Sequence, residues 1–245
     1  MKILLASVFT LLSLGQWPMH NPEIIYQVST SNALKQGAYD GQINVADLAQ
    51  YGDFGIGTFD KLDGEMILLD GQIYQIKADG SAHTVSPQET TPFAEVTQFK
   101  ADFSKKVNSL FDFQQLEKYL KFILADNMNY QAIKIEGRFK NIKTRSVSAQ
   151  QSPYPSFSEV IDQQVCTEYS EIEGTLVGYY MPASAKNKGM PGFHFHFISK
   201  DRQWGGHVLD CAIQEAKVEV DRSAGIEILP TQALSSYTKG LNAQR

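Results

Sequence analysis

Strand-like patterns of apolar and polar residues recur along most of the chain. In the first half, two apolar-rich runs at 65–69 and 72–76 flank Asp70-Gly71, a dipeptide that strongly favours a tight hairpin turn. A further run follows at 133–136, where isoleucines alternate with charged residues. The pattern predicts a protein built largely from strands that are joined by short polar turns.

The helical period of apolar residues is confined to a few segments. The longest begins near Asp112, with Gln115 at the position of a capping-box partner, and ends around Asn127. Short helices are expected at 45–50, where the preceding asparagine can act as the cap, and at 156–164. Many strands with few, segregated helices indicate an α+β protein with mixed or antiparallel sheets.

A proline-containing loop at 152–155 is the natural place to divide the chain. We therefore expect two strand-rich halves with few helices, an N-terminal α+β half at 16–150 and a C-terminal α+β half at 151–245. Residues 1–15 stand apart from both, because they combine one positive charge, a short apolar run and small residues where a signal peptidase cuts.

The first fifteen residues predict a removed signal peptide, and hence a secreted or periplasmic protein. The apolar run is too short to span a bilayer comfortably, so no membrane attachment is expected after its removal. If the run is instead retained in the fold, the protein is cytoplasmic. The two cysteines, Cys166 and Cys211, could pair after export or could both be free thiols.

Composition narrows the classes of partner. The chain has 245 residues, of which 42% are hydrophobic and 20% charged, and its formal net charge is -5. These values are those of an ordinary globular protein. The acidic balance, without clustered lysine and arginine, argues against binding to nucleic acid or to anionic membranes. The oligomeric state stays open, a homodimer included.

Three of the five histidines fall within fourteen residues, as His194, His196 and His207. In a strand, His194 and His196 share one face while the phenylalanines between and around them face the core. A hairpin that folds near Arg202 places His207 opposite His196 on that face. Three imidazoles leave one position of a tetrahedral zinc open, as in catalytic sites. The alternative is a polar strand face in contact with water.

The chain also resembles the alpha-acetolactate decarboxylase family, from about Tyr26 to about Pro230. The resemblance rests on long, ordered motifs in both halves. These motifs are Tyr39-Asp40-Gly41, 52–59, 62–66, 75–80, 91–94, 173–178 and the whole run at 191–210.

This resemblance implies a zinc enzyme that decarboxylates 2-acetolactate (2-hydroxy-2-methyl-3-oxobutanoate) to acetoin and carbon dioxide. The three clustered histidines match the metal ligands of the family. Zinc in that position is expected to chelate the ketone and hydroxyl oxygens of the substrate and to stabilise the enediolate that forms when carbon dioxide leaves. No organic cofactor is expected.

Three further positions are implied by the same resemblance. Glu65 is expected beside the metal, Arg145 matches the proposed proton donor of the family, and Thr58 matches a residue that orients the substrate. Because a guanidinium stays protonated well above neutral pH, Arg145 suits the binding of a carboxylate and Glu65 is the easier proton carrier. The sequence leaves open which of the two delivers the proton.

One departure from the family keeps other functions open. Family members carry a second glutamate in a C-terminal segment, for which residues 240–245 show no equivalent, and Glu227 lies in a different segment. A secreted relative that binds a metal or ligand without turnover is therefore one alternative. A zinc hydrolase that acts on esters or amides is another.

Overall fold

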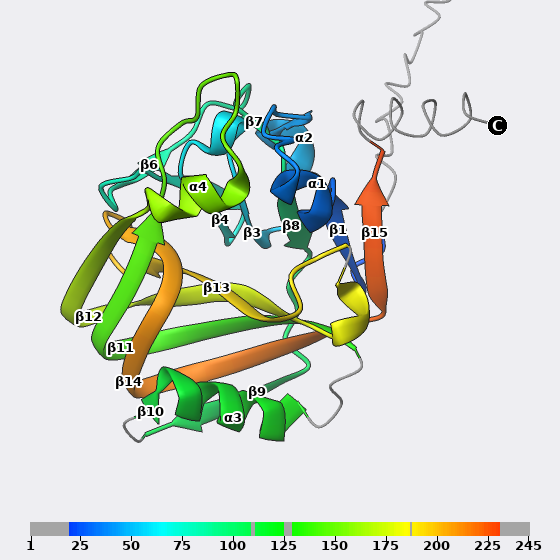
Figure 1. Cartoon of the computed structure of the whole chain (residues 1–245). Coiled ribbons are helices and arrows are strands. Elements are labelled where there is room, and N and C mark those ends of the chain that lie inside the picture. The colour runs from blue at the N-terminus through cyan, green and yellow to red at the C-terminus, as the bar shows by residue number, and fades with distance from the viewer. Residues whose placement is uncertain (1–19, 109–110, 125–128, 187, 231–245) are drawn as a thin grey trace, which may run out of the picture.

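The computed structural model describes residues 20–108, 111–124, 129–186 and 188–230 (Figure 1). Strands dominate this part of the chain, as the sequence predicts. They are β1 (Ile24–Val28), β2 (Ile43–Asn44), β3 (Phe54–Thr58), β4 (Glu65–Leu69), β5 (Gln72–Ile76), β6 (Ala82–Thr84), β7 (Thr90–Thr91), β8 (Ala94–Thr97), β9 (Phe103–Val107), β10 (Phe111–Asp112), β11 (Tyr130–Ser146), β12 (Val165–Met181), β13 (Gly192–Ser199), β14 (Gly205–Ser223) and β15 (Gly225–Leu229).

The helices of the described residues are few and short. They are α1 (Ser31–Lys35), α2 (Val45–Leu48), α3 (Phe113–Leu124) and α4 (Phe157–Asp162), with 3-10 turns η1 (Asp60–Leu62) and η2 (Ala183–Ala185). None of them is long and apolar enough to cross a membrane.

The first large sheet has seven strands in the order β15-β1-β8-β3-β4-β5-β6. Its strand pairs are antiparallel except for β1 and β15, which run parallel, so the sheet is mixed as expected. The hairpin of β4 and β5 turns at Asp70 and Gly71, as the sequence predicts, and both residues have positive φ. Every residue of β3 and β4 is buried, which places these two strands at the centre of the protein.

The second large sheet is antiparallel and contains the longest strands. Its order is β10-β14-β11-β12-β13, β9 pairs with β14, and β14 also pairs with β13. Each of β11, β12, β13 and β14 therefore pairs with two others of the set, and the four strands close into a ring. Figure 1 shows β11, β12 and β14 as long, strongly bent ribbons below the first sheet. Irregular register between β11 and β14 supplies part of this bending.

Apolar cores lie on both faces of these sheets. One core packs α3 against the second sheet, and a second core lies between the two large sheets. A third core packs α2 against the opposite face of the first sheet. The predicted phenylalanine face is confirmed, because Phe195 and Phe197 are buried in the core under α3. His194 and His196 consequently point toward the first sheet.

The predicted helices are present with local differences. At α3 the backbone N–H of Asp112 donates to Gln115, and the backbone N–H of Gln115 donates to Asp112, which confirms the capping box. The predicted end near Asn127 lies outside the described residues. The expected side-chain cap by Asn44 is wrong, because the first N–H groups of α2 donate instead to backbone carbonyls of the 87–89 segment.

Strands from both sides of residue 150 occur in each large sheet: β11 pairs with β12 and β14, and β1 pairs with β15. The expected division into halves at 16–150 and 151–245 stays a prediction about the organisation of the sequence. The predicted signal peptide at 1–15 lies outside the described residues. Of the two outcomes left open for the cysteines, the structure has free thiols, exposed at Cys166 and buried at Cys211.

Candidate metal centre and active site

The three clustered histidines converge on one point between the sheets. His196 on β13 lies opposite His207 on β14, which is the register that the sequence predicts. His194 Nε2 lies 3.2 Å from His207 Nδ1. One ligand nitrogen from each of the three rings falls within 4.8 Å of the other two, so the three rings could hold a metal ion together.

The orientation of His196 is fixed by the backbone of β4. Its Nδ1 lies 2.8 Å from the carbonyl oxygen of Met66. Because a carbonyl only accepts, this contact assigns the ring proton to Nδ1 and leaves a lone pair on Nε2. Such a carbonyl partner is typical of histidines that bind metals.

The lone pair of His196 faces another electron-rich atom. His196 Nε2 lies 3.3 Å from Oε2 of Glu65, and this buried nitrogen has no hydrogen-bond partner in the described part of the chain. The same holds for the buried Nδ1 of His194. Buried acceptors that face one another in this way are satisfied by a cation or a proton. The donor set of the site therefore fits a metal ion.

Burial keeps all three rings neutral. It lowers the pKa of His196 to about 3, and it lowers the pKa of His194 and of His207 well below the ordinary value. The positive charge of Arg145 acts in the same direction. At neutral pH the three nitrogen lone pairs are consequently available, as metal binding requires.

Glu65 and Arg145 form a buried ion pair beside the histidines. Arg145 Nη1 lies 3.1 Å from Oε1 of Glu65, and the two side chains are 13% and 9% exposed. Burial raises the pKa of Glu65, and the neighbouring guanidinium opposes that rise. The carboxyl group thus contacts the Arg145 guanidinium through one oxygen and His196 of the histidine cluster through the other.

The pairing of strands in the second sheet places Arg145 beside the histidines. Arg145 lies near the end of β11 and pairs in register with His207 on β14. The register between these strands shifts between Lys143 and Thr144, and this irregularity determines which residue of β11 faces the histidine. A distant segment of the sequence therefore completes the site that the β13–β14 hairpin begins.

Thr58 ends β3 opposite Glu65 at the start of β4. Its hydroxyl donates a 2.7 Å hydrogen bond to the carbonyl oxygen of Gly64. Gly64 has a φ of +83°, and a Cβ there would lie 2.2 Å from the carbonyl oxygen of Ile76, so glycine is required. The proton of Thr58 is committed to this turn, and its hydroxyl can only accept from a bound molecule.

All six predicted site residues line one small cavity of about 40 Å³. The sequence reasoning missed the remainder of its lining, which is mostly apolar. These further residues are Leu34, Gly57, Leu62, Phe93, Val147, Phe157, Val160, Ile161 and Met190. They come from segments far apart in the sequence, and only the apolar positions of the predicted 156–164 helix gave any sign of them.

Comparison with known proteins agrees with this geometry. Residues 25–239 match the family model described as alpha-acetolactate decarboxylase. The chain belongs to the alpha-acetolactate decarboxylase family. It is therefore an enzyme of the carbon–carbon lyase class, and within that class a carboxy-lyase.

Individual relatives cover most of the chain. The alpha-acetolactate decarboxylase of Methanosarcina mazei is 44% identical over 199 residues, which cover 81% of this chain and 69% of that protein. The Bacillus subtilis enzyme is 37% identical over 210 residues, covering 85% and 82%. A crystal structure of the alpha-acetolactate decarboxylase from Bacillus subtilis strain 168 matches with a TM-score of 0.83 at 36% identity, over 85% of this chain and 89% of that one.

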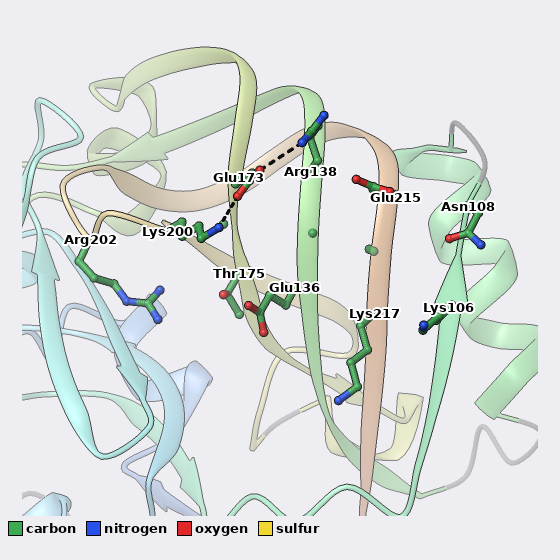
Figure 2. A pocket seen from close by; sticks show the side chains of 13 residues that line it. Lys106, Asn108, Glu136, Arg138, Glu173, Thr175, Lys200, Arg202, Glu215 and Lys217 are labelled. Atoms are coloured by element: carbon green, nitrogen blue, oxygen red, sulfur yellow. Dashed lines mark hydrogen bonds and ion pairs between the residues drawn. The ribbon is translucent and has the colours of Figure 1, made fainter.

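A larger depression on this decarboxylase-family protein lies elsewhere. It has a volume of about 530 Å³ and is lined mainly by charged side chains of β9, β11, β12 and β14 (Figure 2). Glu173 forms ion pairs there with Arg138 and Lys200. None of the six predicted site residues lines it. The six residues to which the sequence assigns a role therefore line the small cavity and not this depression.

Proposed function

We propose that the protein catalyses the zinc-dependent decarboxylation of 2-acetolactate to acetoin and carbon dioxide in the small cavity. The observation that carries the proposal is the convergence of three neutral histidines, two of them buried, on the largely buried Glu65–Arg145 pair. Family membership supplies the reaction class. The histidine cluster supplies the case for a metal.

His194, His196 and His207 would hold the zinc. When bound there, zinc supplies Lewis acidity that stabilises negative charge on oxygen. Three protein nitrogens leave room for a further ligand, which distinguishes a catalytic zinc from a closed structural one. Because the carbonyl of Met66 holds Nδ1 of His196, the Nε2 nitrogen would be the one that binds the ion.

Arg145 binds the carboxylate of the substrate through its guanidinium, which is charged at any working pH. The bond between the carboxylate carbon and C2 then breaks, and its electron pair moves toward the neighbouring ketone to form an enediolate and carbon dioxide. The guanidinium stays beside the negative charge that develops. Because the side chain is largely buried, that charge is stabilised in a site of low dielectric constant.

Glu65 delivers the proton that converts the enediolate to acetoin. Burial raises the pKa of its carboxyl group, so it holds a proton to higher pH than an exposed glutamate does. Glu65 contacts both Arg145 and His196, so its carboxyl group is within reach of a substrate that binds to the guanidinium and the metal site together. Thr58, at the end of β3, accepts a hydrogen bond from the substrate hydroxyl while its own proton holds the Gly64 turn.

We also propose that the protein is secreted. The charge, apolar run and small residues of the first fifteen positions support a removable export signal. The mature enzyme would then act outside the cytoplasm on a small anionic substrate. Comparison of the N-terminus of the exported protein with the printed sequence tests this assignment.

Replacing Glu65 by glutamine tests the role of the carboxyl group. Glutamine keeps the shape but cannot transfer a proton, so we expect kcat for acetoin formation to fall by about 10²–10⁴. Zinc content should stay near that of the wild type, because the histidines are intact. The measurement is acetoin and carbon dioxide release from racemic 2-acetolactate, together with metal analysis.

The matched control is Glu89→Gln, which changes an exposed glutamate outside the cavity. It should leave turnover unchanged. A Glu65→Gln variant with the kcat of the wild type would rule out proton delivery by this residue. Zinc-loaded wild-type protein that releases no carbon dioxide from 2-acetolactate would instead refute the proposed reaction.

A further inference from the structure

The lining of the small cavity has two chemically different parts. Glu65, Arg145 and the histidines form a polar part, and most of the remaining lining residues form an apolar wall. Most of the wall residues belong to one apolar cluster that packs outside the two large sheets. Ligand sites commonly combine a few placed polar groups with such a wall, where the polar groups fix orientation and the wall selects shape.

The apolar wall itself has an inner part and a rim. Val160 on α4, like Leu34 and Phe93, is buried. Phe157 and Ile161 on α4, together with Met190 before β13, are only partly buried. These three residues, which we call the rim, thus contact both the cavity and the solvent.

The rim is mounted on short segments that do not belong to the large sheets. Phe157 and Ile161 lie on α4, which begins at a capping box formed by Ser156 and Glu159. Met190 follows Gly189, whose carbonyl oxygen accepts a 2.6 Å hydrogen bond from the hydroxyl of Ser31. Side chains can therefore change at the rim without disturbing the strands that position the metal ligands.

The substrate also has a polar and an apolar part. Its carboxylate, hydroxyl and ketone oxygens all require polar partners, so its two alkyl groups have only the apolar wall to contact. The cavity is small, and an additional methylene on the substrate needs space that only the wall can provide. A single methylene in an apolar pocket changes kcat/KM by about 10–200-fold.

We propose that Phe157, Ile161 and Met190 set the largest alkyl group that the enzyme accepts on C2 of its 2-acyl-2-hydroxy acid substrate. This inference rests on the proposed function. Ile161 is the position to test first, because it lies on α4 and alanine, which opens the rim, is a strong helix former.

The test compares two substrates, 2-acetolactate and its homologue with an ethyl in place of the methyl on C2. For Ile161→Ala we expect the ratio of kcat/KM, ethyl over methyl, to rise at least tenfold above that of the wild type. Met190→Ala should raise the ratio in the same direction, which covers the case in which one variant folds poorly. Ile161→Phe should lower the ratio.

Ile123→Ala is the matched control, because Ile123 is a partly buried isoleucine of α3 that packs on the core far from the cavity lining. Its ratio should equal that of the wild type. Active Ile161→Ala and Met190→Ala enzymes whose ratios match the Ile123→Ala control would overturn the inference while leaving the proposed function intact. Wild-type protein that turns over neither substrate would overturn the proposed function, and this inference with it.

Discussion

His196 shows how one backbone contact can determine the chemistry of a side chain. The carbonyl oxygen of Met66 accepts a hydrogen bond from Nδ1–H, so the second nitrogen faces Glu65 with a lone pair. The sequence predicts that the three histidines share a face. It does not predict this contact, because Met66 is 130 residues away and its side chain gives no sign of what its carbonyl oxygen does.

Glu95 is a second buried carboxyl group, and the proposed mechanism does not use it. It lies on β8, an inner strand of the first sheet, and neither carboxyl oxygen has a hydrogen-bond partner in the described residues. Burial raises the pKa of Glu95 from 4.5 to about 8. The folded protein therefore holds a proton at this residue over a pH range in which the unfolded chain has released it.

This difference predicts that Glu95 makes stability fall as pH rises. Between about pH 4.5 and pH 8 the folded state binds more protons at Glu95, so the free energy of unfolding decreases by up to about 1.4 kcal/mol per pH unit. In Glu95→Gln this contribution disappears, and the pH dependence should flatten. Urea unfolding at several pH values measures both slopes.

Two comparisons isolate the effect. Asp221, whose pKa is also raised, is present in both proteins and cancels in the difference between them. The exposed-site variant Glu89→Gln should keep the slope of the wild type. Equal slopes for wild type and Glu95→Gln between pH 5 and pH 8 would show that Glu95 is not protonated in the folded state.

At the scale of single elements, local rules account for most of what the sequence predicts. The hairpin at 70–71, the capping box at Asp112 and the α4 helix all depend on residues within a few positions of one another. Such interactions can be predicted from the local sequence. The cap at Asn44 is the exception, and it is wrong because the 87–89 segment supplies acceptors from elsewhere in the chain.

The hairpin between β4 and β5 provides a test of this local control. Gly71 has a φ of +77° with no atom near the position of a Cβ, so Gly71→Ala adds backbone strain alone. We expect the variant to lose about 1–2 kcal/mol of stability. The measurement is the free energy of unfolding in urea.

Gly225→Ala is the matched control for the hairpin variant. Gly225 has no positive φ, and a Cβ there would lie 3.8 Å from Ile24 Cδ1, an ordinary contact. That substitution should be neutral or stabilise the protein by up to about 1 kcal/mol, because alanine restricts the unfolded chain. Equal losses in the two variants would mean that the turn does not require a positive φ at residue 71.

At the scale of the whole molecule, the sequence predicts the class of the fold but not the ring into which four of its strands close. Alternation and turn residues indicate many strands in mixed or antiparallel sheets, which the structure confirms. The ring of β11 to β14 and the parallel pairing of β1 with β15 join segments far apart in the chain. No local pattern specifies such pairings, because every buried strand offers the same backbone groups.

The site, like the fold, could be predicted only in part. The three histidines could be predicted from residue spacing, because they lie on the two strands of one hairpin. Glu65, Arg145 and Thr58 come from three other strands, and only the resemblance to a known family pointed to them. The sequence did not predict that the apolar wall belongs to the site, since the wall is assembled from short segments that meet only in the complete fold.

The most direct test of the central claim is to measure zinc content and acetoin formation together in His196→Ala and in the wild type. Wild-type protein should contain about one zinc per chain and convert 2-acetolactate, whereas the variant should lose both the metal and the activity. The exposed-histidine variant His83→Ala should keep both. A His196→Ala protein that retains zinc and turns over 2-acetolactate at the rate of the wild type would contradict the account.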